Sequence, residues 1–411
     1  MTTSAELPAT LGHGAPNPYC GTGLPRRRVR PAPACADPTP FYRGGEWARS
    51  PLCIADPGEL IVALPPMLGF VPERSLVVAV LRAGLPPGSG PVIDALARFD
   101  LDPPGGRGGL AARIAQCLSR ICAAEQAEEV LVVVVDEGAA QPGPPDPRCV
   151  ARQVALVTAL DKRLATHEIL LAGAWAVPAI DTGEHWWPLL GGPGGGVLPD
   201  PGKSAVALAS VLDGRPIHSS RAQLTAVLAP DPELCALVAA ELGGAFERGR
   251  DRYVRAVRHG ELDSYHRGLL ERVLWEVAHT AAGSLPEAAA IAELVGALRE
   301  PPVRGALYAL AYTDHAAAAE RLWVRMVRGL TGPDRADAAA LLGYGAYVRG
   351  DGPFAGMALD AALEADPCHC MAGLLESGLR SGMRPGPLRR VGRSGHSIAA
   401  DLGIALGPLV R

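Results

Sequence analysis

The pattern of hydrophobic and polar positions changes near residue 219. Before that point, short apolar runs alternate with segments of helical spacing, whereas the later periodic segments are all helical. Alternating strand and helix signals are typical of a layered α/β domain, and helical spacing alone is typical of an all-α domain. The sequence therefore predicts a mixed-sheet α/β layered domain over residues 48–218, followed by a helical domain over residues 219–383.

Short apolar runs mark the strands of the first domain. The runs "SLVVAVL" and "VLVVVV" are uninterrupted, which is typical of strands buried on both faces. The strand candidates cover residues 75–81, 92–101, 128–137, 169–178 and 184–190. The second is expected to pair antiparallel with the first. Helical spacing predicts helices over residues 109–127, 150–168 and about 204–212.

A helix is predicted ahead of the first strand, in "DPGELIVALPP". Asp56 suits the N-cap position, and Glu59 completes a capping box. Pro65 and Pro66 disfavour continuation of a helix, so this one is expected to end by Leu64.

The stretch "LGFVPERSLVV" that follows is predicted to be a turn that leads into the strand. Gly69 can adopt the left-handed conformation that reverses the chain after a helix. Glu73 and Arg74 are expected to be solvated, and Ser75 to begin the strand. The interpretation is a structural junction.

In the second domain, residues 340–367 resemble one tetratricopeptide repeat. The matching positions are Leu342, Gly343, Gly350, Ala355, Leu359, Ala362 and Pro367. Small residues allow two antiparallel helices to approach closely, and the proline ends the second helix. Ala339 and Ala346 fill positions that are usually aromatic. No array of three repeats is recognisable, so we expect a single tetratricopeptide-like hairpin at about 340–380.

Both termini differ in composition from the rest of the chain. Residues 1–47 are rich in Pro, Gly, Ala and Arg without a period, and they are predicted to be disordered. Residues 384–411 return to Gly, Pro and Arg and are predicted to form a flexible tail.

Composition indicates a cytoplasmic protein. The 411 residues carry a formal charge of -4, which gives no general attraction to nucleic acid or to an anionic membrane. The nine cysteines are odd in number and follow no secretory signal, so reduced thiols are expected. No apolar run approaches the roughly 18 residues that a membrane span needs.

A family resemblance covers roughly residues 50–380. "DPGELIVALPPMLGFVPERSLVVAVL", "ARFDL", "VLVVVVD", "GEHWWPLL" and "SRAQL" occur in an order similar to that of the domain-of-unknown-function 4192 family of high-GC Gram-positive bacteria. Many members carry cysteines and a proline after the tandem tryptophan, where this chain has "LLGGPGGG". The resemblance therefore implies no metal or redox role for that loop. It implies a fold, and no chemistry.

Polar residues at strand ends are the candidates for ligand binding. Asp136 follows the valine strand, and ligands of open α/β sheets lie outside the carboxyl ends of strands. Arg98 and Asp100 are two positions apart, so they share one face of a strand. Trp186 and Trp187 should face opposite ways, so that one enters the core and the other, for which Trp187 is the candidate, lies near a loop mouth. The candidate ligand-binding residues are Arg98, Asp100, Asp136, Trp187 and Arg221.

Other searches for chemistry give one weak anion site. Lys203 and Ser204 end the sequence "PGKS", but the glycine spacing of a phosphate-binding loop is absent. No serine lies in a nucleophile elbow, and Cys368 and Cys370 lack a second pair at zinc-ligand spacing. No metal site is predicted, and catalytic residues and cofactors stay unknown.

Three functions remain open. The first is a non-enzymatic interaction or regulatory scaffold that binds another protein through the helical domain. The second is a small-molecule or nucleotide-binding α/β domain, with enzymatic activity left uncertain. The third is association with nucleic acid, the least favoured, through the arginine-rich terminal segments and through Arg248, Arg252 and Arg255 on one helix face. No membrane partner is expected, and the oligomeric state is left open.

Overall fold

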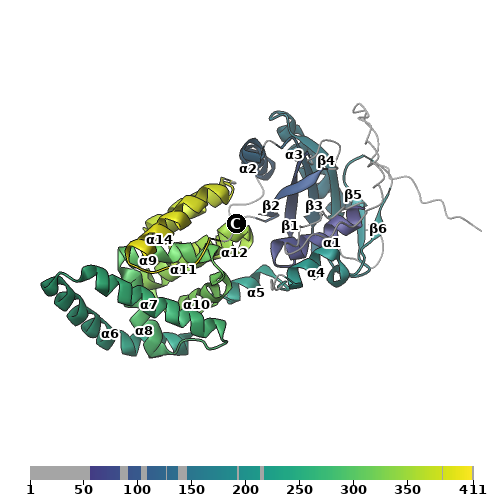
Figure 1. Cartoon of the computed structure of the whole chain (residues 1–411). Helices are drawn as coiled ribbons and strands as arrows, with labels where there is room; N and C mark the ends of the chain where they lie inside the picture. The colour runs from purple at the N-terminus through teal and green to yellow at the C-terminus, as the bar shows by residue number, and fades with distance from the viewer. Residues whose placement is uncertain are drawn as a thin grey trace, which may run out of the picture. The chain divides into compact units, whose positions relative to one another are not determined.

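Figure 1 shows the computed structural model of the chain. The described residues are 56–83, 91–102, 109–125, 127–137, 146–191, 194–212, 217–381 and 383–409. The segment predicted to be disordered, residues 1–47, lies outside them. Of the helices described, none combines the length and apolar character needed to cross a membrane.

A mixed sheet organises the α/β region. Its strands are β1 (Ser75–Arg82), β2 (Val92–Asp100), β3 (Glu129–Val135), β4 (Leu170–Val177), β5 (His185–Pro188) and β6 (Gly196–Val197). Their order in the sheet is β2-β1-β3-β4-β5-β6. β1 runs antiparallel to both of its neighbours, whereas β3 and β4 are parallel and are joined by a helical crossover. The predicted antiparallel pairing of the first two strands is confirmed.

Helices cover the two faces of this sheet. They are α1 (Pro57–Leu68) on one face and α2 (Leu110–Glu125) and α3 (Pro147–Ala165) on the other, while α4 (Ala205–Leu212) packs against α1. Alternate residues of β3 point to opposite faces, so Val132 and Val134 pack with α2 and α3, while Val133 and Val135 share a core with α1. The central position predicted for this valine strand is therefore confirmed.

The first helix is longer than the sequence predicts. It begins as expected, with the Asp56 side chain accepting a hydrogen bond from the Gly58 backbone at 3.2 Å. It then continues through Pro65 and Pro66 to Leu68, so the predicted end at Leu64 is wrong. The two prolines remove two backbone donors, and burial of both rings offsets this cost. Gly69 ends the helix with a φ of 76°, as predicted.

From residue 217 on, the described residues are mainly helical. The helices are α5 (Arg221–Ala226), α6 (Pro232–His259), α7 (Leu262–Ala281), α8 (Ala288–Arg299), α9 (Pro301–Leu307), α10 (Ala316–Gly329), α11 (Gly332–Arg349), α12 (Gly352–Ala365), α13 (Cys370–Arg380) and α14 (Arg389–Asp401). A 3-10 turn, η3 (Tyr308–Tyr312), separates α9 from α10. The predicted fold class, an α/β region followed by an all-α region, is confirmed.

α11 and α12 form the helical hairpin expected near residue 340. A Cβ at Gly343 would lie 2.8 Å from side-chain atoms of Leu359, so the absence of a side chain is what allows this approach. Tyr344 is completely buried, and most of α11 is buried with it. The hairpin is thus part of the core, and it presents little surface to a partner.

The C-terminal segment is a second correction. Residues 389–401 form α14, and Gly392, Gly395 and Ala399 of this helix are buried. A Cβ at Gly395 would lie 2.6 Å from the Gly305 carbonyl oxygen, which shows how closely α14 packs on α9. The prediction of a flexible tail over 384–411 is therefore wrong over this helix, because the glycines taken as signs of a loose chain serve close helix packing. The boundary predicted at 218/219 stays a prediction.

Candidate functional site

Charged side chains from separate segments meet at one edge of the sheet. β2 and β3 end at this edge and β1 begins there, because β1 is antiparallel to both. Ser75 pairs with Asp100 on one side and with Val135 on the other, so Asp100 and Asp136 flank the start of β1. We call the following residues the edge cluster: Arg74, Ser75, Arg98, Asp100, Asp102, Asp136 and Arg221.

Arg98 organises one side of the edge cluster. Its Nη2 donates to Asp100 Oδ1 at 2.6 Å, and its Nε donates to Ser75 Oγ at 2.8 Å. Its guanidinium carbon lies 5.7 Å from the centre of the Phe70 ring. Burial lowers the pKa of Arg98, and the neighbouring Asp100 carboxylate opposes that effect. Arg98 is therefore a fixed cation rather than a mobile surface charge.

A short backbone bridge brings Arg221 to the same place. His218 pairs with Phe70 in a parallel bridge, in which the Val71 amide donates to the His218 carbonyl oxygen at 2.9 Å. α5 begins three residues later, and Arg221 Nη1 lies 3.8 Å from Asp100 Oδ2. Asp100 thus stands between two arginines that are more than 100 positions apart in the chain.

Asp136 lies on the other side of the edge cluster and is only 5% exposed. Its Oδ2 accepts from the Cys149 thiol and from Gln153 Nε2, both at 3.5 Å, and its Oδ1 lies 3.9 Å from Arg74 Nη1. Arg74 also donates to Asp102, and this hydrogen bond raises the pKa of Arg74. The predicted solvation of Arg74 is therefore incomplete, since its side chain is half exposed and doubly paired.

Cys149 is the thiol closest to these charges. Burial raises its pKa, and the Asp136 carboxylate adds to that effect, while Arg152 opposes it. A protonated thiol is a weak nucleophile, so this environment is the reverse of the one that activates a catalytic cysteine. The arrangement favours a structural role for Cys149.

The charges of the edge cluster are balanced within the cluster. Three guanidinium groups face three carboxylates, and the side chains of Arg74 and Arg221 are each 49% exposed. A polar ligand could reach these two arginines from solvent, in competition with their present carboxylate partners. The edge cluster can therefore orient a small anion or zwitterion, and it holds no activated nucleophile.

Not every candidate from the sequence lies here. Trp187 is in β5, which β3 and β4 separate from β1, although the two tryptophans do pack on opposite faces as expected. Lys203 pairs with Asp200 at 3.2 Å, and Ser204 Oγ accepts from the Ala207 amide at 3.1 Å as a cap of α4. Anion binding at Lys203 and Ser204 stays a prediction.

A second candidate site is a groove between α6, α7 and α8. Its volume is about 300 Å³, and its residues include Phe246, Gly249, Tyr253, Tyr265, Leu269, Gly296 and Arg299. Tyr253 and Tyr265 meet edge to face with ring centres 5.7 Å apart. A Cβ placed on Gly249 or Gly296 would meet no atom within 4 Å, so both glycines border open space. We call this space the α6–α8 groove.

One wall of the groove is held rigidly. The Arg299 guanidinium carbon lies 4.1 Å from the Phe246 ring centre. Two hydrogen bonds of 2.8 Å fix the guanidinium to the Asp334 carboxylate, which raises the pKa of Arg299. Because this bidentate pair already restricts the Arg299 side chain, that side chain loses little rotamer entropy when a ligand binds.

Basic side chains surround the α6 end of the groove. Arg250, Arg252, Arg255 and Arg258 are exposed, and none of them forms a salt bridge with any residue that the structure describes. Arg248, by contrast, lies 3.6 Å from Glu293. This end of α6 therefore carries an excess of positive charge, although Glu247 and Asp251 lie among these arginines.

A comparison with known proteins identifies the family. A family model described as "Domain of unknown function (DUF4192)" matches residues 57–386. The chain belongs to the DUF4192 family. No curated protein and no solved structure matches it. The match includes both the edge cluster and the α6–α8 groove, whereas α14 lies beyond it. The expected family is confirmed, while its bacterial origin and the tetratricopeptide likeness stay predictions.

Sequence reasoning predicted only some of the contacts that form at the edge cluster of this DUF4192 chain. Asp100 pairs with both Arg98 and Arg221, and Arg74 links Asp136 to Asp102. The sequence interpretation treated Arg74 as a solvated turn residue and Ser75 as the start of the strand, and it did not single out Asp102. Arg74 adopts a φ of 43°, and no pattern in the sequence indicated this conformation or its two carboxylate partners.

Proposed function

We propose that this protein is a non-enzymatic binding protein whose helical region holds a segment of another protein in the α6–α8 groove. The observation that supports this most directly is an open groove with aromatic walls and mixed charge, with arginines at its rim that form no salt bridge to a described residue. Buried aromatic anchors contribute most of the energy at such interfaces, while rim charges select the partner. The partner segment that fits is acidic, with one apolar or aromatic side chain for the groove.

An acidic protein segment suits the groove better than nucleic acid does. Glu293 and Glu300 line the groove beside its arginines, so the charge of the groove is mixed, whereas a continuous phosphate backbone needs positive charge along its whole length. A peptide can place its own carboxylates beside Arg250 and Arg252 and its anchor between the two carboxylates of the groove. Six cysteines among the described residues are free, which supports a reducing, cytoplasmic location for this function.

Filling the groove tests the proposal. Gly296→Leu places a side chain in the open space of α8, and leucine also favours a helix over glycine by roughly 1 kcal/mol, so folding should be preserved. Gly373→Leu is the matched control, because Gly373 is also inside a helix, borders open space and lies outside the groove. Deletion of residues 340–380 would be a poor test, since α11 and α12 are core helices.

The probes are a fluorescein-labelled peptide with leucine and phenylalanine flanked by glutamates, its lysine-flanked counterpart and a single-stranded DNA. We expect the acidic peptide to bind the full chain, with at least a tenfold loss, about 1.4 kcal/mol, in Gly296→Leu and no loss in Gly373→Leu. Photocrosslinking should place the peptide anchor near Tyr253. Equal binding by Gly296→Leu and the parent protein would refute the proposal, as would a preference for the DNA.

The edge cluster favours a second function, binding of a small anionic or zwitterionic molecule. Its support is the convergence of Arg74, Arg98 and Arg221 on carboxylates from separate segments. Native mass spectrometry of the protein purified from its own host would detect such a molecule. We expect Arg221→Ala to lose it and Gly296→Leu to retain it. A protein that carries no small molecule, or one that retains it in Arg221→Ala, would count against this function.

A further inference from the structure

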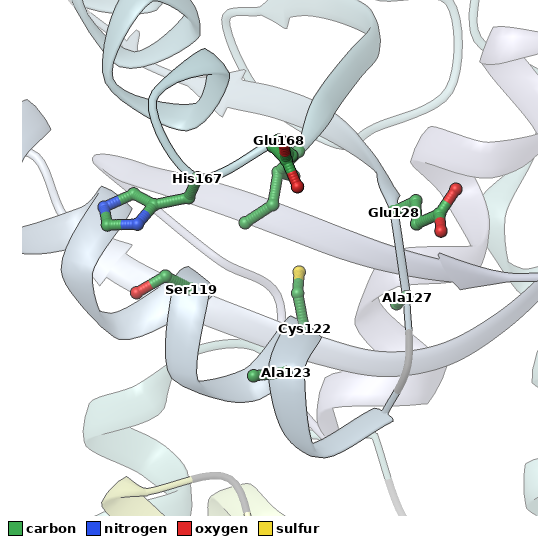
Figure 2. Close-up of a pocket in the computed structure, with 8 residues that line it drawn as sticks. Ser119, Cys122, Ala123, Ala127, Glu128, His167 and Glu168 are labelled. Carbon is green, nitrogen blue, oxygen red and sulfur yellow. The ribbon is translucent and has the colours of Figure 1, made fainter.

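A second pocket lies at the edge of the sheet opposite to the edge cluster, where β3 and β4 begin (Figure 2). Its volume is about 440 Å³. The lining residues come from the end of α2, from the start of β3 and from the turn between α3 and β4. They are Ser119, Cys122, Ala123, Ala127, Glu128, His167, Glu168 and Ile169. We call this space the α2–α3 pocket.

The floor of the α2–α3 pocket is apolar. Cys122, Ala127 and Ile169 are 3%, 6% and 5% exposed, respectively. Figure 2 shows the Cys122 sulfur pointing toward the middle of the pocket, with Glu168 beyond it. Burial raises the pKa of the Cys122 thiol to about 11, so the thiol is neutral at physiological pH. No residue that the structure describes forms a hydrogen bond with this thiol, which leaves it as a soft, uncharged contact surface.

The rim of the pocket is negative. Glu128 and Glu168 are exposed, and neither forms a salt bridge with a described residue. The C-terminal ends of α2 and α3 lie beside the pocket, and each adds the partial negative charge of a helix C-terminus. The basic residues in the last turn of α3, Lys162 and Arg163, are not among the lining residues.

Glu168 has an unusual backbone conformation. Its φ is 61°, in the left-handed region that glycine adopts without cost. The turn closes α3, with the Ile169 amide donating to the Leu164 carbonyl oxygen at 3.1 Å. A glycine would serve this turn with less strain, so local geometry does not explain the carboxylate. Glu168 is also one of the residues that line the pocket.

We propose that the α2–α3 pocket binds a small organic cation, a primary alkylammonium ion whose ammonium group pairs with Glu168. The alkyl part would cover Cys122 and Ile169 and displace water from the apolar floor. Glu128, on the side of the pocket opposite to His167 in Figure 2, adds to the negative field. This inference is independent of the α6–α8 groove and of the proposed protein partner.

Three probes of similar size separate charge from apolar contact: hexylammonium, 1-heptanol and hexanoate. The full chain is titrated with each by calorimetry, and alkylation of single cysteines by iodoacetamide is followed by peptide mass spectrometry. We expect hexylammonium alone to bind measurably. It should slow alkylation of Cys122 and leave the exposed Cys368 unchanged.

Two variants complete the test. Glu168→Gln should weaken hexylammonium binding by about tenfold, a typical effect of losing one charged partner, whereas Glu233→Gln, an exposed glutamate in the first turn of α6, should have no effect. Equal binding of 1-heptanol, an unchanged affinity in Glu168→Gln, or unprotected Cys122 at saturation would each overturn the proposal. Ala123→Leu, which fills the rim from an exposed helix position, should abolish binding without altering the fold.

Discussion

Gly343 gives the sharpest test of how the helical region is packed. Replacing it by alanine would place a Cβ 2.8 Å from both Cγ and Cδ2 of Leu359, and 3.4 Å from the Ala355 carbonyl oxygen. Leu359 and Ala355 are completely buried, so neither can swing into solvent to make room. The new methyl group must instead shift α11 away from α12 or force Leu359 out of its rotamer.

The magnitude follows from two opposing effects. Alanine favours a helix over glycine by about 1 kcal/mol, while one extra methyl group in a packed core costs about 1–3 kcal/mol. Gly345, in the same helix, has no atom within 4 Å of a placed Cβ, so Gly345→Ala has only the favourable effect. We expect Gly343→Ala to be less stable than Gly345→Ala by about 1–3 kcal/mol.

Urea and thermal unfolding followed by circular dichroism would measure this difference. A gap of 1 kcal/mol corresponds to about 2–4 °C in the unfolding midpoint of a region of this size. Hydrogen exchange of peptides from α11 and α12 would locate the change, since the α/β region should exchange as in the parent protein. Equal stability of the two variants would refute the packing argument, because the clash then has no energetic consequence.

Four further outcomes are expected from the structure. Gly69→Val should lower the free energy of unfolding by about 2 kcal/mol or more, because a β-branched residue is disfavoured at a φ of 76°. Gly69→Asn should lower it less, and an equal loss of stability in the two variants in equilibrium unfolding would contradict the conformational argument. Arg98→Ala should lower the free energy of unfolding by about 1–3 kcal/mol, because it removes the hydrogen bonds to Ser75 and Asp100. An unchanged free energy of unfolding in the same assay would show that the edge cluster does not stabilise the fold. Glu168→Gly should raise the unfolding midpoint by the equivalent of about 1 kcal/mol while hexylammonium binding falls, and a lower midpoint would show that the strain is absent. Burial raises the pKa of the Cys122 thiol from 9.0 to about 11, so between these pH values the folded state keeps a proton that the unfolded state loses, and the free energy of unfolding should fall as the pH rises. Cys122→Ala should reduce this pH dependence in urea titrations. An unchanged pH dependence in this variant would contradict the raised pKa of Cys122.

The elements of the fold follow largely from local sequence. The valine run of β3, the antiparallel pairing of β1 with β2, the Asp56 cap and the left-handed Gly69 are all recognisable without a structure. Each of these features depends on contacts between near neighbours or on the conformational range of a single residue, so the local sequence is enough to predict it.

Local rules fail where packing opposes them. Pro65 and Pro66 should end α1, yet the helix continues because both rings are buried in the core. Gly392 and Gly395 indicate a loose tail, yet they allow α14 to pack closely on η3 and α9. In both cases the energy of tertiary burial exceeds a local preference of a few kcal/mol.

The candidate sites were decided by the tertiary structure. The sequence by itself determined which residues carry charge at strand ends, and it placed Arg98 and Asp100 on one face. It could not show that Arg221 reaches Asp100, that Arg74 joins Asp102 to Asp136, or that Gly249 and Gly296 border one groove. These contacts depend on strand order and helix packing, which arise from burial of apolar surface between segments far apart in the chain. That burial carries no signature in the residues immediately around each site.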